Sequence, residues 1–241
     1  LRHLPPEVSF VQAAALGCRF TTAYRAVLQQ GQLQPRQSVA IFGCGGLGLS
    51  CILMAKHRQL ARQIIAVDVS PSALKKAREL GATHTVLLNH GDDVEEEPQA
   101  MAKLVAQCTD GHEGADLTID AAGFAATSQV AVYATRPSGR MVQVGLPYGN
   151  PPIPMSLVAS REITIVGSHG FDAQDLPDLL ELIATNDDEG KIMDPCQLVE
   201  REVTLEEGCK ALQEMDHTSP LGIVMITKFG KVSTITTPSR L

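Results

Sequence analysis

A glycine-rich turn between two apolar segments constrains the fold of this 241-residue chain more than any other feature. The turn reads Gly43-Cys-Gly45-Gly46-Leu47-Gly48. The apolar run 39–42 before it has the length of a strand, and residues 47–57 after it carry apolar side chains at helical spacing. A membrane span over 38–55 is a poor interpretation, because glycines in its middle make a poor bilayer helix. We therefore predict a strand, a tight turn and the start of a helix.

The turn matches the pattern G-x-G-x-x-G through Gly43, Gly45 and Gly48, with Gly46 and Leu47 filling two of the variable positions. Glycines at these places permit a tight turn, close approach of a pyrophosphate, and close packing of helix on strand. The free N–H groups of the helix N-terminus favour phosphate. The pattern therefore predicts a dinucleotide site, and the alternative is a turn that serves packing alone.

Asp68 follows the next apolar run, 64–67, and lies 20 residues after the last glycine of the turn. A carboxylate there accepts hydrogen bonds from the ribose hydroxyls and repels a 2′-phosphate, so we predict NAD rather than NADP. The alternative interpretation is a helix cap. Three basic residues on the following helix are interpreted as its solvated face: Lys75, Lys76 and Arg78.

Strand-length apolar runs alternate with helical patterns through most of the chain. Continuous apolar strands in β-α-β order are typical of a parallel sheet covered on both faces by helices. The predicted fold class is therefore α/β, a doubly wound parallel sheet of Rossmann type. Strands are expected at 39–42, 64–67, 85–88, 116–119, 140–144 and 162–166, and helices at 47–57, 70–80, 99–107 and 126–135, with a turn at 137–139.

The two ends of the chain carry a different pattern. Before the alternating region, Ser9 and Gln12 have capping-box spacing ahead of a helix that we expect to stop at Gly17, and a second helix follows over 22–30. After Gly167 we expect, in order, a helix over 175–184, a polar break at 186–190, a strand over 197–203, a helix capped by Thr204 with Glu207, a strand over 223–226 and a loose tail.

Charge and cysteine content exclude several classes of protein. The net charge is −7, only 4% of the residues are aromatic and Trp is absent, which argues against a nucleic-acid partner. The six cysteines are scattered, which argues against a disulfide scaffold and favours a reducing, cytoplasmic location. No segment reads as a signal peptide or favours a membrane. The acidic segment 89–98 is interpreted as a surface loop rather than a metal site.

Several motifs resemble the medium-chain, zinc-dependent alcohol dehydrogenase family. They are 16–24 (Leu-Gly-Cys-Arg-Phe-Thr-Thr-Ala-Tyr), the glycine turn, 66–68 (Ala-Val-Asp), 120–123 (Asp-Ala-Ala-Gly), 144–147 (Val-Gly-Leu-Pro) and 166–168 (Val-Gly-Ser). The resemblance covers the chain up to about residue 226, with the motifs in the order and spacing of the family.

The resemblance implies roles for individual residues. Cys18 matches the last ligand of the family's catalytic zinc, and Thr22 matches the position that packs on the nicotinamide. Gly145 and Leu146 match a turn whose backbone faces the carboxamide. By the same resemblance, two further residues lie where the chain returns to the catalytic domain beside the nicotinamide: Ser168 and His169.

The chain also departs from the family pattern. The family's Gly-His-Glu zinc segment precedes the cysteine, whereas the only such tripeptide here, 111–113, follows it, so we interpret His112 as a surface turn residue. Zinc is therefore expected only together with an N-terminal half that these residues lack. The chain begins at Leu1, which suggests missing upstream residues. The predicted division is a remnant of a GroES-like catalytic domain (1–19), the NAD-binding domain (20–165), a return into the catalytic domain (166–228) and a tail (229–241).

The resemblance implies hydride transfer between a small-molecule alcohol and an aldehyde or ketone in the complete protein. We expect this chain alone to bind NAD without turnover. It also implies a homo-oligomer that forms through the sheet edge at 163–166. Three alternatives stay open: a zinc-free reductase of the quinone reductase type, a non-catalytic NAD-binding truncation, and a methyltransferase, which also uses a glycine-rich turn and a following acidic residue.

Overall fold

The computed structural model describes residues 3–88, 98–147, 149–185, 193–215 and 220–228. Three predicted features lie wholly or almost wholly outside these residues: the acidic loop, of which only Pro98 is described, the polar break at 186–190 and the tail at 229–241. Within the described residues, no helix has both the length and the apolar character needed to cross a membrane.

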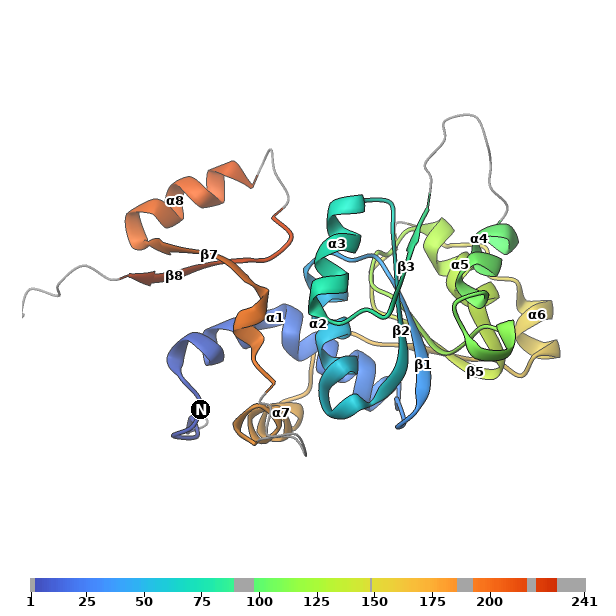
Figure 1. Ribbon diagram of the computed structural model, residues 1–241, viewed down its shortest axis with the longest axis horizontal. Coiled ribbons are helices and arrows are strands. Elements are labelled where there is room, and N and C mark those ends of the chain that lie inside the picture. Colours follow the sequence, from blue (N-terminus) through green and yellow to red (C-terminus); the bar gives the residue numbers. More distant parts are fainter. Residues whose placement is uncertain (1–2, 89–97, 148, 186–192, 216–219, 229–241) are drawn as a thin grey trace, which may run out of the picture.

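The centre of the molecule is a parallel sheet of six strands in the order β3-β2-β1-β4-β5-β6 (Figure 1). The chain starts in the middle of the sheet, runs outward to one edge, returns and runs outward to the other. This topology confirms the doubly wound fold, and its order reverses between β1 and β4. The strands are β1 (Gln37–Phe42), β2 (Ala61–Asp68), β3 (His84–Leu87), β4 (Ala115–Asp120), β5 (Thr135–Gln143) and β6 (Thr164–Gly167).

Helices cover both faces of this sheet, because successive strand side chains point to opposite faces. Val39 and Ile41 of β1 belong to a core formed with α1, α2 and α3, whereas Ala40 and Phe42 belong to a second core formed with α4 and α5. The helices are α1 (Phe10–Tyr24), α2 (Gly46–Lys56), α3 (Pro71–Leu80), α4 (Pro98–Ala106), α5 (Ala125–Ala134), α6 (Met155–Ser160), α7 (Asp175–Ala184) and α8 (Leu205–Glu214).

A smaller unit at the C-terminal end is set apart from the large sheet (Figure 1). Its strands β7 (Val199–Thr204) and β8 (Ile223–Lys228) pair in parallel, and α8 connects them. The predicted capping box of Thr204 and Glu207 begins α8. The short helix η4 (Pro195–Leu198) leads into β7 and packs against α1. The predicted domain boundaries stay a prediction, although the large sheet does end at Gly167.

Local features of α1, β5 and α6 refine the sequence prediction. The capping box of Ser9 and Gln12 begins α1, and Gly17 breaks this helix with non-helical backbone angles, as predicted. The second helical part starts before residue 22, however, and leads into the π-helical turn η1 (Arg25–Gln30). The expected turn 137–139 lies within the bounds of β5, in the stretch where the pairing with β4 skips from Thr135 to Arg140 and Ser138 has a φ of +55°. Helix α6 was not predicted, because six residues show too little periodicity.

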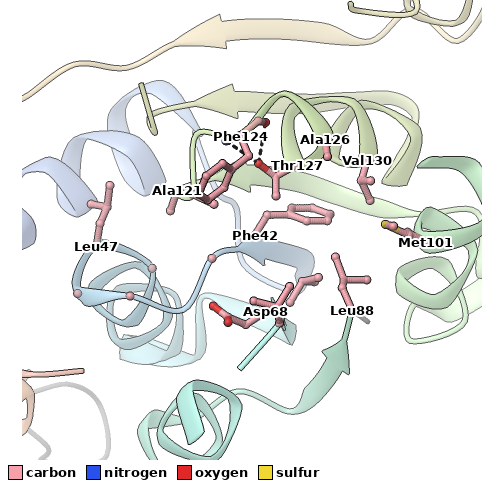
Figure 2. Close-up of a pocket in the computed structure, with 17 residues that line it drawn as sticks. Phe42, Leu47, Asp68, Leu88, Met101, Ala121, Phe124, Ala126, Thr127 and Val130 are labelled. Carbon is pink, nitrogen blue, oxygen red and sulfur yellow. Dashed lines mark hydrogen bonds between the residues drawn. The ribbon is translucent and has the colours of Figure 1, made fainter. Parts of the chain in front are cut away.

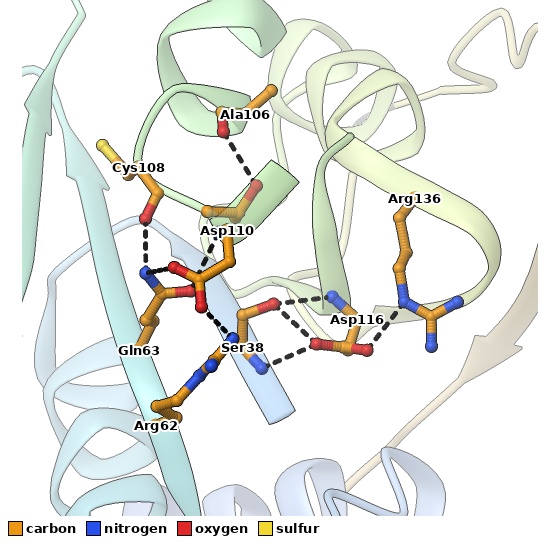
Figure 3. Close-up of polar contacts among 9 residues, drawn as sticks. Ser38, Arg62, Gln63, Ala106, Cys108, Asp110, Asp116 and Arg136 are labelled. Carbon is orange, nitrogen blue, oxygen red and sulfur yellow. Dashed lines mark hydrogen bonds and ion pairs between the residues drawn. The ribbon is translucent and has the colours of Figure 1, made fainter. Parts of the chain in front are cut away.

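The amino ends of the strands are joined by a polar network (Figure 3). The Asp116 carboxylate of β4 accepts hydrogen bonds from the Ser38 backbone N–H at 2.8 Å and from its hydroxyl at 2.7 Å. It also accepts one from Arg136 Nε at 2.7 Å. Beside it, Gln63 Nε2 of β2 donates to the Cys108 carbonyl and to Asp110 at 3.1 Å each. Strands β1, β4 and β5 are thus tied together at this edge, and β2 is tied to the segment that precedes β4.

The Asp116 carboxyl group couples this network to pH. Burial alone would raise its pKa, but the hydrogen bonds from Ser38 and the Arg136 guanidinium outweigh burial and lower the pKa below the ordinary value of 3.8. A carboxyl whose pKa is lower in the folded state stabilises the fold above its unfolded pKa, and this stabilisation is lost as the pH falls through the folded pKa.

We predict that Asp116→Asn lowers the free energy of unfolding by about 1 to 2 kcal/mol at neutral pH. The difference from the parent chain should shrink as the pH falls from about 4 towards 2, since protonated aspartic acid resembles asparagine. Urea denaturation at several pH values measures both effects, with Glu113→Gln at an exposed position as the control. A constant difference across that pH range would contradict the assignment.

Candidate functional site

The glycine turn lies at the carboxyl end of β1, at the switch point of the sheet. Gly43 has a φ of +87°, which favours glycine. A Cβ on Gly48 would collide with the Gly43 carbonyl oxygen, so the first turn of α2 packs directly on the end of the strand. A Cβ on Gly45 would meet no protein atom within 4 Å and would project into open space. The turn therefore leaves a cradle next to the helix N-terminus that a side chain at Gly45 would fill.

Asp68 ends β2 beside this turn, as predicted. One carboxylate oxygen accepts a hydrogen bond from the Cys44 backbone N–H at 2.6 Å, and the other accepts one from the Ser70 N–H at 2.7 Å. Each oxygen retains a second lone pair for a further donor. Asp68 thus fixes the glycine turn, and its half-buried carboxylate stays available to a ligand.

A cavity of about 710 Å³ opens beside the turn (Figure 2). The glycine turn and Asp68 line one side of it. Apolar side chains from β2, α4 and α5, and from the segments that follow β3 and β4, line the rest. Sequence reasoning missed these wall residues, since each reads as an ordinary core position: Val69, Leu88, Met101, Ala121, Phe124, Ala126 and Val130.

A second buried carboxylate, Asp120, ends β4 and organises the segments that follow β4 and β5. It is fully buried and accepts hydrogen bonds from the Ala122 and Gly123 N–H groups at 3.1 and 3.0 Å. It also accepts bonds from the side chains of Thr127, Ser128 and Gln143 at 2.8 to 3.0 Å. The sequence motif 120–123 pointed to this segment but did not reveal that its aspartate is a buried anchor.

The Asp120 backbone carbonyl reaches the next turn as well. It accepts hydrogen bonds from the Val144 and Gly145 N–H groups at 3.1 and 2.8 Å. Gly145 then packs on Gly123, and a Cβ on Gly145 would lie 2.7 Å from the Gly123 Cα. Leu146, the next residue, is 73% exposed. Asp120 therefore joins the turns after β4 and β5 into one unit.

The remaining predicted site residues do not line this cavity. Ser168 is buried and its N–H donates to the Gln143 carbonyl at 2.9 Å, whereas His169 is exposed. The Oγ1 atom of Thr22 and the Oγ atom of Ser168 are both buried and lack a hydrogen-bond partner. Buried polar atoms are normally partnered, so each calls for a ligand group or water.

Cys18, the predicted zinc ligand, lies exposed after the kink in α1. It lines a second, largely apolar hollow of about 610 Å³ that also involves α7. Among the described residues no group of three His, Cys, Asp or Glu side chains lies close enough to hold a metal. A catalytic zinc needs three protein ligands, so these residues alone do not fit the ion. His112 is exposed in the turn η3 (Asp110–His112), as predicted.

The residues around the glycine turn, in contrast, fit a dinucleotide. The cradle at Gly45 meets the N-terminus of α2, where unpaired N–H groups and the helix dipole attract phosphate. Asp68 lies at hydrogen-bonding reach of the turn, in the position that suits a ribose. The cavity beyond has the apolar lining expected for an aromatic base.

We predict that Asp120→Asn destabilises the chain by about 2 to 4 kcal/mol, because the amide NH₂ group faces donors that need an acceptor. Amide hydrogen exchange at Ala122, Gly123 and Gly145 should quicken more than exchange in β2. Thermal unfolding and exchange followed by mass spectrometry measure the two effects. The exposed Asp178→Asn serves as the control, and equal behaviour of the two variants would contradict the anchoring role.

Comparison with known proteins places this geometry among the dehydrogenases. The family model described as zinc-binding dehydrogenase matches residues 46–185, which is more than half of the chain. An aliphatic (R)-hydroxynitrile lyase from Linum usitatissimum is 37% identical over 124 residues, which cover 52% of this chain and 28% of the relative. A sorbitol dehydrogenase from Bacillus subtilis is 30% identical over 211 residues, covering 87% of this chain and 55% of the relative.

A solved structure described as an NAD-dependent alcohol dehydrogenase superposes with a TM-score of 0.73 at 27% identity. The match covers 94% of this chain and 62% of that structure. The chain spans 28 to 55% of the length of the two curated relatives above. On the match of the family model, together with the doubly wound sheet and the glycine turn, the chain belongs to the zinc-binding dehydrogenase family.

Proposed function

We propose that this chain supplies the NAD site of an oxidoreductase that transfers a hydride between a small-molecule alcohol and an aldehyde or ketone. The observation that carries the proposal is the placement of the open cradle at Gly45, the Asp68 carboxylate and the apolar cavity around one turn. Relatives and solved structures of this family include sorbitol and alcohol dehydrogenases. A relative named as a lyase shows that family membership alone does not fix the reaction.

Each part of the site has a separate task in binding the cofactor. The N-terminus of α2 holds the pyrophosphate, Asp68 accepts hydrogen bonds from the adenosine ribose, and the cavity wall encloses the adenine. We assign the nicotinamide end to the predicted residues outside the cavity. The backbone of Gly145 and Leu146 faces the carboxamide, Thr22 packs on the ring, and two residues lie beside it: Ser168 and His169.

Bound NAD supplies the chemistry, because its nicotinamide ring accepts or gives up a hydride. The contribution of this chain is to hold the ring in place and exclude water. The unpartnered hydroxyls of Thr22 and Ser168 support this assignment, since buried donors of this kind can orient a bound polar group. No step is assigned to a metal. Cys18 remains a proposed zinc ligand only in a complete protein that contributes further ligands.

We predict that Asp68→Ala weakens NADH binding by about tenfold or more, because the ribose loses a hydrogen bond to a charged acceptor. Titration of NADH fluorescence measures the affinity. Asp68→Asn retains an acceptor for the Cys44 N–H, so it separates ribose binding from the integrity of the turn. Asp110→Ala at the opposite edge is the control. Unchanged NADH affinity in both Asp68 variants would contradict the assignment of Asp68 to the ribose.

Turnover, ligand binding and zinc analysis together separate the proposal from its alternatives. NADH binding without alcohol oxidation by this chain is the expected result, and alcohol oxidation by the same chain would contradict the expectation that it is inactive alone. Binding of S-adenosylmethionine in place of NADH would favour a methyltransferase.

Zinc analysis of a protein extended upstream of Leu1 distinguishes the zinc enzyme from a zinc-free reductase. Cys18→Ser is the variant that should lose the metal.

The exposed edge of the sheet supports a further proposal, that two copies pair through β6. Strand β6 lies at the end of the sheet, and Ile165 is 39% exposed there. Unpaired edge strands readily pair with another copy of themselves. We predict a dimer by light scattering and a monomer for Ile165→Lys, with the same circular dichroism in both. A monodisperse monomer in the parent chain would count against this pairing.

A further inference from the structure

The side chain of Arg19 lies on the glycine turn. Arg19 belongs to the part of α1 that follows the kink at Gly17, and α1 packs against α2. A Cβ on Gly46 would lie 2.6 Å from Arg19 Cδ and 2.7 Å from Arg19 Cζ, and it would also collide with Nη1. The guanidinium group is therefore seated against the first residue of α2, beside the cradle.

The identity of Gly46 is explained by this contact. The pattern G-x-G-x-x-G does not ask for glycine at this position. Gly46 is the first residue of α2 and its φ lies outside the left-handed range, so the backbone does not require glycine either. The missing side chain instead makes room for Arg19.

The charges around the turn show what the guanidinium can do. Of the described residues that line the cavity, Asp68 alone carries a charge, and that charge is negative. A pyrophosphate brings further negative charge, and the dipole of α2 offsets only part of it. Arg19 Nη1 donates to the Gly222 carbonyl at 3.4 Å, and within the described part of the chain the other N–H donors of the guanidinium are left for a ligand.

We propose that Arg19 binds the diphosphate of the dinucleotide, as a cation that reaches the glycine turn from α1. The inference rests on the proposed function, since it assumes a dinucleotide on this turn. A planar guanidinium can donate two parallel hydrogen bonds to phosphate oxygens, which makes such a contact strong and directional. The bond to Gly222 holds the arginine in place for it.

Binding of ADP, NADH and adenosine to the chain as it stands tests the proposal by calorimetry. Arg19→Met should weaken ADP and NADH by about 10- to 100-fold and leave adenosine unchanged, because adenosine has no phosphate. The affinity for ADP should also become less sensitive to salt. Arg19→Lys, which keeps the charge, should fall between the parent and Arg19→Met. The control is Arg62→Gln, at the amino end of β2.

A double-mutant cycle adds an independent measurement. Gly46→Ala should displace Arg19 and weaken ADP, whereas Gly46→Ala in an Arg19→Ala background should cost much less, because the side chain it would collide with is gone. Fully additive losses would show that the two residues act separately and would overturn the proposal. Circular dichroism of each variant without ligand confirms that the chain is folded.

The remaining outcomes are also distinguishable. Parent-like ADP affinity in Arg19→Met overturns this proposal and leaves the proposed function intact. An equal loss of affinity for adenosine and ADP also overturns the proposal. Such a loss would mean that Arg19 only joins α1 to the loop before β8. A parent chain that binds neither ADP nor NADH overturns both the proposed function and the role of Arg19.

Discussion

The approach of the Gly43 carbonyl to the Cα of Gly48 is the contact on which the site depends. It lets the first turn of α2 press on the end of β1, which aims the free N–H groups of the helix at the space beyond the sheet. A single methyl group at Gly48 would force the helix away from the strand. The cradle, the cavity next to it and the position of Asp68 all depend on the absence of that methyl group.

The two edges of the sheet differ in how their polar groups are satisfied. At the amino edge, Asp116 and Gln63 find their partners within the protein, and the network ties strands and neighbouring segments together. At the carboxyl edge, Asp120 is also satisfied internally, but Ser168, which follows β6, keeps a buried hydroxyl without a partner, as does Thr22 of α1. Both edges are thus stabilised by a satisfied aspartate, and the carboxyl edge in addition has unfilled hydrogen-bonding capacity, as expected for open α/β sheets.

The fold was predictable because its signals are local. The glycine turn, the apolar run before Asp68 and the capping residues Ser9 and Thr204 each depend on neighbours within a few positions. The features that sequence reasoning missed depend on distant contacts. Nothing near Arg19 in the sequence shows that its side chain meets Gly46.

The candidate site shows the same contrast between parts that local sequence predicts and parts that depend on distant contacts. Its phosphate and ribose parts lie on one strand–turn–helix segment and the following strand, so the motif was enough to find them. The adenine wall draws single residues from several elements, and Met101 or Val130 read in sequence as ordinary core positions. Zinc was the hardest part to judge, because a single cysteine does not define a metal site and the described residues contain no group of three possible ligands.

The contact between Gly123 and Gly145 carries a consequence for how this sequence can change over evolutionary time. Each glycine occupies the space that a side chain on the other would need, and both turns are tied to Asp120. Neither position can accept a larger residue unless the opposite turn moves with it. The two loops therefore form a single unit of variation, and a lineage that reshapes one of them must remodel both together.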